Sequence, residues 1–163
     1  MTKQLLRLTA LLLLMMFLVG TSALATEGTS DTMKVGTEMP MMGKMTEAGY
    51  IDLTPEEAKM LIDSTPDLVI VDVSPKYAEG HLPGALNYYV GDGSLDAAIP
   101  MLDMSKPYLV YCHVDSASIA GATKLVEAGF SPVYRLEGNY SAWVEAGYPI
   151  EKLILADLGM YFL

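Results

Sequence analysis

Two continuous apolar runs constrain this chain more than any other feature of its sequence. Residues 68–73 (LVIVDV) and 107–111 (PYLVY) are rich in β-branched and aromatic residues, and polar and apolar side chains do not alternate in them. A strand with one face in water alternates, whereas a strand covered on both faces does not. The two runs therefore predict buried strands of a parallel sheet.

Helix signals occur between the predicted strands. Thr54 can cap a helix that begins at Pro55, and Glu57 can complete a capping box. A second helix is expected from about Ser118, with Gly129 as its C-terminal stop. The remaining elements are short: strands at residues 51–53, 85–88 and 133–136, and helices at residues 95–101 and 140–146. This alternation predicts one three-layer α/β domain over residues 50–152.

The first 25 residues have the pattern of an export signal. Lys3 and Arg7 precede an uninterrupted apolar run over residues 8–20, and Ala23 and Ala25 are the small residues that a signal peptidase requires. The run is shorter than the roughly 20 residues of a membrane-spanning helix. We expect cleavage after Ala25 and a periplasmic or extracellular protein, with an uncleaved membrane anchor as the alternative.

Loss of this signal would leave a strongly acidic chain. The whole sequence has 10 basic and 20 acidic residues, so removal of Lys3 and Arg7 leaves 8 basic residues and a net charge of −12. Such a surface repels nucleic acid and anionic lipid. We therefore expect no nucleic-acid partner, and contact with a membrane only through an uncleaved signal.

Two further segments flank the predicted domain. Residues 26–49 are rich in Thr, Gly, Ser and Met without a clear period, which predicts a flexible linker. The alternative is Cu(I) binding by its thioether sulfurs, although no His or Cys joins Met33, Met39, Met41, Met42 and Met45. We expect no metal site and no cofactor. The apolar tail, residues 153–163, is too short to span a bilayer and is expected to pack on the core or on another chain.

Cys112 is the only cysteine, and it lies directly after the second apolar run. In parallel sheets, ligands bind beyond the carboxyl ends of the strands. Main-chain N–H groups of the next turn would converge on the sulfur there and, with the helix dipole, lower the pKa of the thiol. The thiolate could attack a substrate or carry a second sulfur. The alternative is a buried packing residue, because free cysteines are among the most buried residue types.

The residues after Cys112 complete a candidate binding loop. His113 could support the thiolate or transfer a proton, or it could be an ordinary exposed loop residue. Asp115 would raise the pKa of the thiol if its carboxylate lay close to the sulfur. Ser118 could donate a hydrogen bond or cap the next helix. The candidate site residues are Cys112, His113, Val114, Asp115, Ser116, Ala117 and Ser118.

From Tyr50 to Pro149 the sequence resembles a rhodanese-like sulfurtransferase domain. Residues 77–87 (YAEGHLPGALN) are similar to the most specific segment of that family, aromatic-x-x-Gly-His-Ile-Pro-Gly-Ala-x-Asn. The strand that ends in Asp72-Val73, the strand that delivers Cys112 and the closing pattern over residues 129–149 agree in order. The resemblance implies a five-stranded parallel sheet between helices, structural roles for His81 and Asp72, and a persulfide on Cys112 passed from a sulfur donor to a thiol acceptor.

The active loop departs from the family pattern. The family usually has glycine at the fourth loop position and a basic residue at the sixth, where this chain has Asp115 and Ala117. Ser74 replaces the basic residue that follows Asp-Val, and Asn139 replaces the second glycine of Leu-x-Gly-Gly. Arg135 is the only arginine outside the signal, and the sequence does not place it near the loop.

These departures bear on the sulfur donor. Loss of one charge-assisted contact costs about 1.5–3 kcal/mol, so we expect weak activity with thiosulfate. The expected partner is a small neutral sulfur donor, or a protein persulfide or thiol acceptor. The alternative is a catalytically lapsed binding or redox-sensing module.

Overall fold

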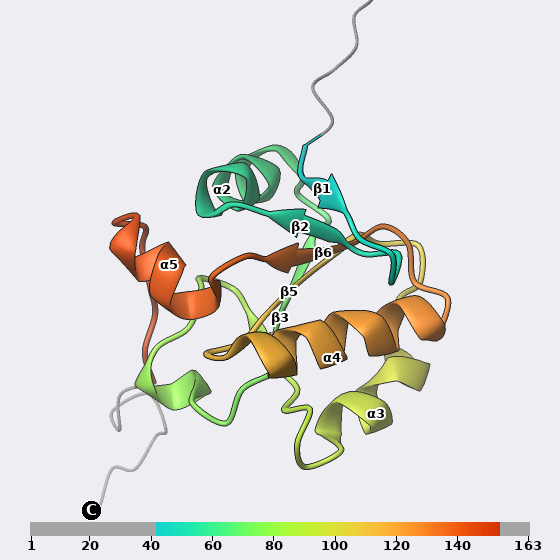
Figure 1. Ribbon diagram of the computed structural model, residues 1–163. Helices are drawn as coiled ribbons and strands as arrows, with labels where there is room; N and C mark the ends of the chain where they lie inside the picture. Colours follow the sequence, from blue (N-terminus) through green and yellow to red (C-terminus); the bar gives the residue numbers. More distant parts are fainter. Residues whose placement is uncertain (1–41, 154–163) are drawn as a thin grey trace, which may run out of the picture. The chain divides into compact units, whose positions relative to one another are not determined.

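Strands and helices alternate along residues 42–153, the part of the chain that the computed structural model describes (Figure 1). The strands are β1 (Lys44–Met45), β2 (Ile51–Leu53), β3 (Val69–Asp72), β4 (Leu86–Asn87), β5 (Tyr108–Tyr111) and β6 (Val133–Leu136). The α-helices are α2 (Pro55–Ser64), α3 (Ser94–Ala98), α4 (Asp115–Glu127) and α5 (Asn139–Glu145), with 3-10 turns η1 (Tyr77–Glu79) and η2 (Ile99–Met101). The predicted α/β alternation is confirmed.

The sheet has the strand order β1-β2-β6-β5-β3-β4. The strands from β2 to β4 are parallel, and the two apolar runs are neighbours, with Val69 opposite Tyr108 and Asp72 opposite Tyr111. The expected sheet of five parallel strands is therefore present. It is extended by a sixth strand, because β1 pairs with β2 in the antiparallel direction.

Strand β1 corrects the boundary predicted at residue 50. Residues 44 and 45 were expected in the flexible linker, but Lys44 lies opposite Asp52 in the sheet. A tight turn between the strands explains the pairing, since both the N–H and the hydroxyl of Thr46 donate to the carbonyl of Tyr50. The predicted signal, residues 26–41 of the linker and residues 154–163 of the tail lie outside the described residues.

Helices cover both faces of the sheet, as predicted. Val71 and Val110 pack with the α3 and α4 side chains Leu95, Ala122 and Leu125. Their strand neighbours Ile70 and Leu109 pack on the other face with the α2 and α5 side chains Ala58, Leu61 and Trp143. Figure 1 shows the same division, with α3 and α4 on one side of the strands and α2 and α5 on the other. Within residues 42–153, no helix has the length and apolar character to cross a bilayer.

The helix ends show where local sequence signals sufficed. The capping box forms as predicted, because the Thr54 hydroxyl accepts the N–H of Glu57 and the Glu57 carboxylate accepts the N–H of Thr54. Gly129 has a φ of +94° and stops α4 as expected. The start of α4 was predicted wrongly: it begins at Asp115, with Val114 rather than Ser118 at the N-cap.

Candidate active site

Cys112 follows the last residue of β5, and two residues, His113 and Val114, separate it from α4. This is the carboxyl end of a parallel strand, as the sequence predicted. The residue is only 1% exposed and belongs to the apolar cluster beneath α3 and α4. In its solvent access, Cys112 therefore matches the alternative prediction, a buried packing residue.

The pKa of the Cys112 thiol is raised, contrary to the expected lowering. Burial is the largest cause, and the charge of Asp72 adds to it. The main-chain N–H groups of Val114 and His113 act in the opposite direction, as predicted. The expected N–H donors do lower the pKa of the thiol. The cost of removing a thiolate from water raises it by more, so the net pKa is raised.

His113 is not the exposed loop residue that one interpretation expected. Its ring is half-buried and stacks on Tyr140, with 4.4 Å between ring centroids and 18° between ring planes. Burial lowers the pKa of this histidine, so the ring is neutral near pH 7. Its Nε2 atom is buried and has no hydrogen-bond partner at normal distance and angle among residues 42–153, although the nearby main chain of Gly80 opposes the lowering of the pKa.

The other predicted site residues divide between the turn and the helix. Val114 and Ser116 are exposed, whereas Ala117 is half-buried against the apolar cluster. Ser118 is fully buried inside α4, where its hydroxyl donates to the carbonyl of Asp115 at 3.1 Å. Only residues 112–114 form a loop; residues 115–118 are helical. We call residues 112–118 together the Cys112 segment.

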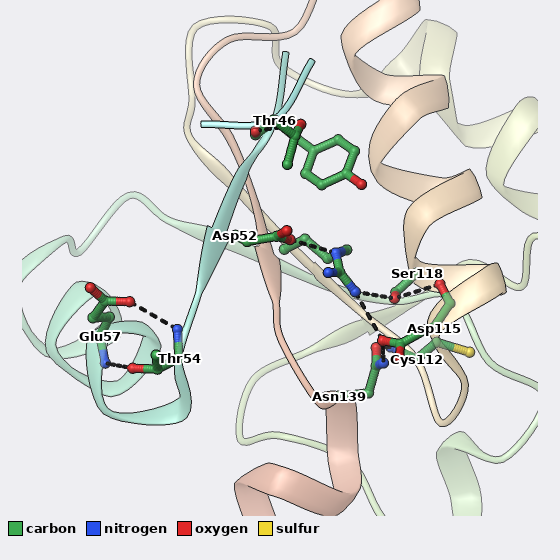
Figure 2. A network of polar contacts seen from close by, with 10 residues as sticks. Thr46, Asp52, Thr54, Glu57, Cys112, Asp115, Ser118 and Asn139 are labelled. Atoms are coloured by element: carbon green, nitrogen blue, oxygen red, sulfur yellow. Dashed lines mark hydrogen bonds and ion pairs between the residues drawn. The ribbon is translucent and has the colours of Figure 1, made fainter. Parts of the chain in front are cut away.

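Asp115 is turned toward polar partners and away from the sulfur. Its Oδ1 accepts bonds from Nδ2 of Asn139 at 2.7 Å and from Nη1 of Arg135 at 3.0 Å. Figure 2 shows the Cys112 sulfur pointing away from the contact between Asp115 and Asn139. The carboxylate that raises the pKa of the thiol is Asp72, so the effect assigned to Asp115 belongs to another residue.

Sequence reasoning missed two side chains that reach this site. Arg135 was not placed near the loop, yet its guanidinium touches both Asp115 and Ser118. Asn139 was treated only as a lost glycine, yet its Oδ1 accepts the N–H of Cys112 at 3.0 Å. A signal for Arg135 existed: it is a charged residue in an otherwise apolar strand, and parallel pairing of β2 with β6 places Asp52 opposite it.

Asp72 and His81 both have structural partners. Oδ1 of Asp72 accepts the N–H of Ser74 at 2.8 Å, although its Oδ2 lacks a partner among the described residues. His81 is buried, stacks on Tyr77 with 3.7 Å between ring centroids, and exchanges two main-chain hydrogen bonds with Glu151. The predicted structural roles agree with these contacts.

Two of the five methionines in the candidate Cu(I) cluster lie within residues 42–153. Met42 and Met45 line an apolar pocket of about 160 Å³ with Gly43, Ile51 and Tyr134. Met33, Met39 and Met41 lie outside residues 42–153, so Cu(I) binding stays an alternative. Within those residues, no group of three or more His, Cys, Asp or Glu side chains could hold a metal ion.

Comparison with known proteins gives sulfurtransferases as relatives. Thiosulfate sulfurtransferase GlpE of Pseudomonas fluorescens (strain SBW25) is 33% identical over 99 residues, which cover 61% of this chain and 88% of that protein. GlpE of Shewanella oneidensis is 38% identical over 79 residues, covering 47% of this chain and 76% of that protein.

Solved structures agree on the fold. The crystal structure of the Alr3790 protein from Anabaena sp. matches with a TM-score of 0.57 and 28% identity, covering 65% of this chain and 96% of that chain. Thiosulfate sulfurtransferase from Pseudomonas aeruginosa matches with a TM-score of 0.55 and 27% identity, covering 63% of this chain and 20% of that chain. The model of the rhodanese-like domain matches residues 54–146, more than half of the sequence, and the chain therefore belongs to the rhodanese-like domain family.

Proposed function

We propose that this protein is a sulfurtransferase that carries sulfane sulfur as a persulfide on Cys112. The observation that carries the proposal is the position of Cys112 at the carboxyl end of β5, with the N–H groups of His113 and Val114 acting on its sulfur. Those N–H groups favour an anion, whether the thiolate or the outer sulfur of a persulfide. The sulfurtransferase relatives support the same reaction class.

The transfer needs no change in net oxidation state. The Cys112 thiolate attacks the outer sulfur of a donor persulfide, so a new S–S bond forms on Cys112 while the donor's S–S bond breaks. The donor leaves as a thiolate and takes the proton that Cys112 gave up. An acceptor thiolate then attacks the outer sulfur on Cys112, which becomes an acceptor persulfide, and Cys112 returns to its thiolate.

The charges around the Cys112 segment favour a weakly charged donor over thiosulfate. The Arg135 guanidinium is paired with the carboxylates of Asp52 and Asp115 and its side chain is only 7% exposed, so it attracts a dianion weakly. The charge of Lys76 lowers the pKa of His113, but the Lys76 side chain is half-exposed, and its Nζ lies 4.0 Å from a carboxylate oxygen of Glu79. We therefore propose a small neutral donor or a protein persulfide as substrate, with weak activity toward thiosulfate.

Mass spectrometry of the intact protein tests the persulfide directly. After incubation with thiosulfate or with a small thiol persulfide, the chain should gain about 32 Da, one sulfur atom, and more fully with the persulfide donor. Since the chain has one cysteine, Cys112→Ser should abolish the gain with both donors. Absence of the adduct in the unmodified chain with every donor would reject the sulfurtransferase.

One observation favours a second candidate, a catalytically lapsed binding or redox-sensing module. Cys112 is 1% exposed, and the raised pKa keeps its thiol protonated at neutral pH. A module of this kind would keep its partner when Cys112 is replaced by alanine. Loss of partner binding in Cys112→Ala would count against it.

Export is also part of the proposal. The basic residues Lys3 and Arg7, the apolar run and Ala23-Leu24-Ala25 support cleavage after Ala25 and a periplasmic or extracellular location. N-terminal sequencing of the protein from an exported fraction should begin at Thr26. A chain that keeps Met1 in the membrane fraction would support the anchored alternative.

A further inference from the structure

The main chain of Cys112 is held on both sides of its α-carbon by the start of α5. Its N–H donates to Oδ1 of Asn139 at 3.0 Å, and its carbonyl accepts the N–H of Tyr140 at 3.0 Å. Asn139 has a φ of +59°, a left-handed conformation that asparagine tolerates better than other non-glycine residues. At this position the asparagine side chain accepts the Cys112 N–H, a bond that glycine could not make.

The orientation of the Asn139 amide is imposed by Asp115. Nδ2 of Asn139 donates to Oδ1 of Asp115 at 2.7 Å, which leaves only the amide oxygen to face the N–H of Cys112. A flipped amide would place a donor against the N–H of Cys112 and an acceptor against the carboxylate. Asp115 thus selects the one orientation in which both hydrogen bonds form.

Asp115 is in turn anchored to the sheet through Arg135. The Arg135 side chain is 7% exposed, and its Nε donates to Asp52 at 2.6 Å while its Nη1 donates to Asp115 at 3.0 Å. Asp52 and Arg135 are paired across β2 and β6, so the guanidinium is fixed by two strands. Figure 2 shows this chain of contacts running from Asp52 to Asp115 and Asn139.

We propose that Asp115, Arg135 and Asn139 form a brace that positions the Cys112 segment for sulfur transfer. This inference rests on the proposed sulfurtransferase function. The brace holds the peptide of Cys112, from which the N–H groups of His113 and Val114 follow, and it keeps the Asp115 carboxylate away from the sulfur. Asp115 and Asn139 both stand where the family pattern has glycine, and here they act as one unit. All three are positioning residues, because they act through the main chain of Cys112.

Hydrogen exchange at the Cys112 amide tests the brace without any sulfur chemistry. The full chain has one cysteine, so isotopic labelling of cysteine nitrogen gives a single amide signal. Asn139→Gly removes the acceptor and relieves the positive φ, so its fold should persist while exchange accelerates about tenfold. Asp115→Ala frees the Asn139 amide and should accelerate exchange about threefold, whereas in Asp115→Asn an amide oxygen can accept the same bonds and should restore protection.

The rate of persulfide loading adds a readout that a purely structural role would not move. In Asn139→Gly, loading from a small thiol persulfide should fall about tenfold, because the loop N–H groups no longer hold the anionic product. Alkylation by iodoacetamide also consumes the thiolate, so it should slow as well, but by less than loading, because its neutral thioether product needs no N–H donors. Asp96→Asn is the matched control, since it removes an exposed carboxylate that pairs with Lys124, and it should change neither rate.

Two results would overturn the brace. The first is equal Cys112 exchange in the unmodified chain, Asn139→Gly and Asp115→Ala. The second is a parallel fall of loading and alkylation in Asn139→Gly, which would mean general disruption. Failure of the proposed function is distinguishable from both, because it appears as the absence of persulfide in the unmodified chain, whatever the exchange rates are.

Discussion

The two sides of Cys112 differ in how completely their polar atoms are paired. On the β6 side, Asp52, Arg135, Asp115 and Asn139 form a continuous set of hydrogen bonds that ends on the N–H of Cys112. On the β3 side, Oδ2 of Asp72 and Nε2 of His113 are buried and have no partner within residues 42–153. Strand β5 lies between β6 and β3, so the sulfur-bearing residue separates a satisfied region from an unsatisfied one.

The difference assigns different tasks to the two sides. Buried polar groups are normally paired, and a fully paired network adds rigidity, whereas an unpaired atom costs stability and is retained most readily where chemistry uses it. The β6 side therefore has a structural role and holds the main chain of Cys112 in place. On the β3 side, the charge of Asp72 raises the pKa of both the thiol and His113, although burial is the larger cause of each shift.

Removal of Arg135 should have the largest effect on stability. In Arg135→Met, Asp52 and Asp115 lose their cation, and we expect the free energy of unfolding to fall by about 3 kcal/mol, as for one partner taken from a buried ion pair. Urea unfolding measures the change. The double variant Arg135→Met/Asp52→Asn should recover part of it, because the least exposed carboxylate is then neutral.

A matched ion pair sharpens this expectation. Lys124 lies 2.6 Å from Asp96, the same distance as Arg135 from Asp52, but its side chain is 36% exposed against 7% for Arg135. Lys124→Met should therefore cost less than about 1 kcal/mol. Equal costs for the two substitutions would show that the β6 network is an ordinary surface contact.

Asp72→Asn should act in the opposite direction, because burial raises the pKa of Asp72. The folded chain then holds a proton that the unfolded chain releases, so stability is fully present below the ordinary carboxyl pKa and falls as pH rises through the folded value. The variant avoids that fall. At pH 7 it should be more stable than the unmodified chain by about 1 kcal/mol, and the gain should vanish near pH 3.

The same variant should affect the sulfur. Loss of the Asp72 charge removes the smaller of the two causes that raise the pKa of the Cys112 thiol, so alkylation at pH 7 should accelerate while burial still keeps the pKa above its ordinary value. The pH profile of iodoacetamide alkylation gives the midpoint. An unchanged midpoint would show that the Asp72 charge does not act on the Cys112 thiol.

These contrasts also show which features were predictable from sequence. The runs at residues 68–73 and 107–111, the Thr54 cap and the Gly129 stop are local patterns, and they placed the parallel sheet, its helices and Cys112. The brace is not local: Arg135 is 20 residues from Asp115, and Asn139 is 27 residues from Cys112. The predicted direction of the shift in the thiol pKa was wrong, because the sequence indicates nearby N–H groups but not how deeply the sulfur is buried.

The smallest expected effect concerns His113, the other unpaired group on the β3 side. Burial lowers its pKa, so below about pH 6.5 the unfolded chain gains a proton before the folded chain does, and stability falls with falling pH in that window. His113→Phe keeps an aromatic ring on Tyr140 and removes the unpaired Nε2, so it should raise stability by about 0.5 kcal/mol at pH 7 and by more at pH 5. Thermal unfolding at the two pH values measures both gains. Destabilisation at pH 7 would mean that Nε2 has a bonding role in solution, which would remove His113 from the unsatisfied side of the site.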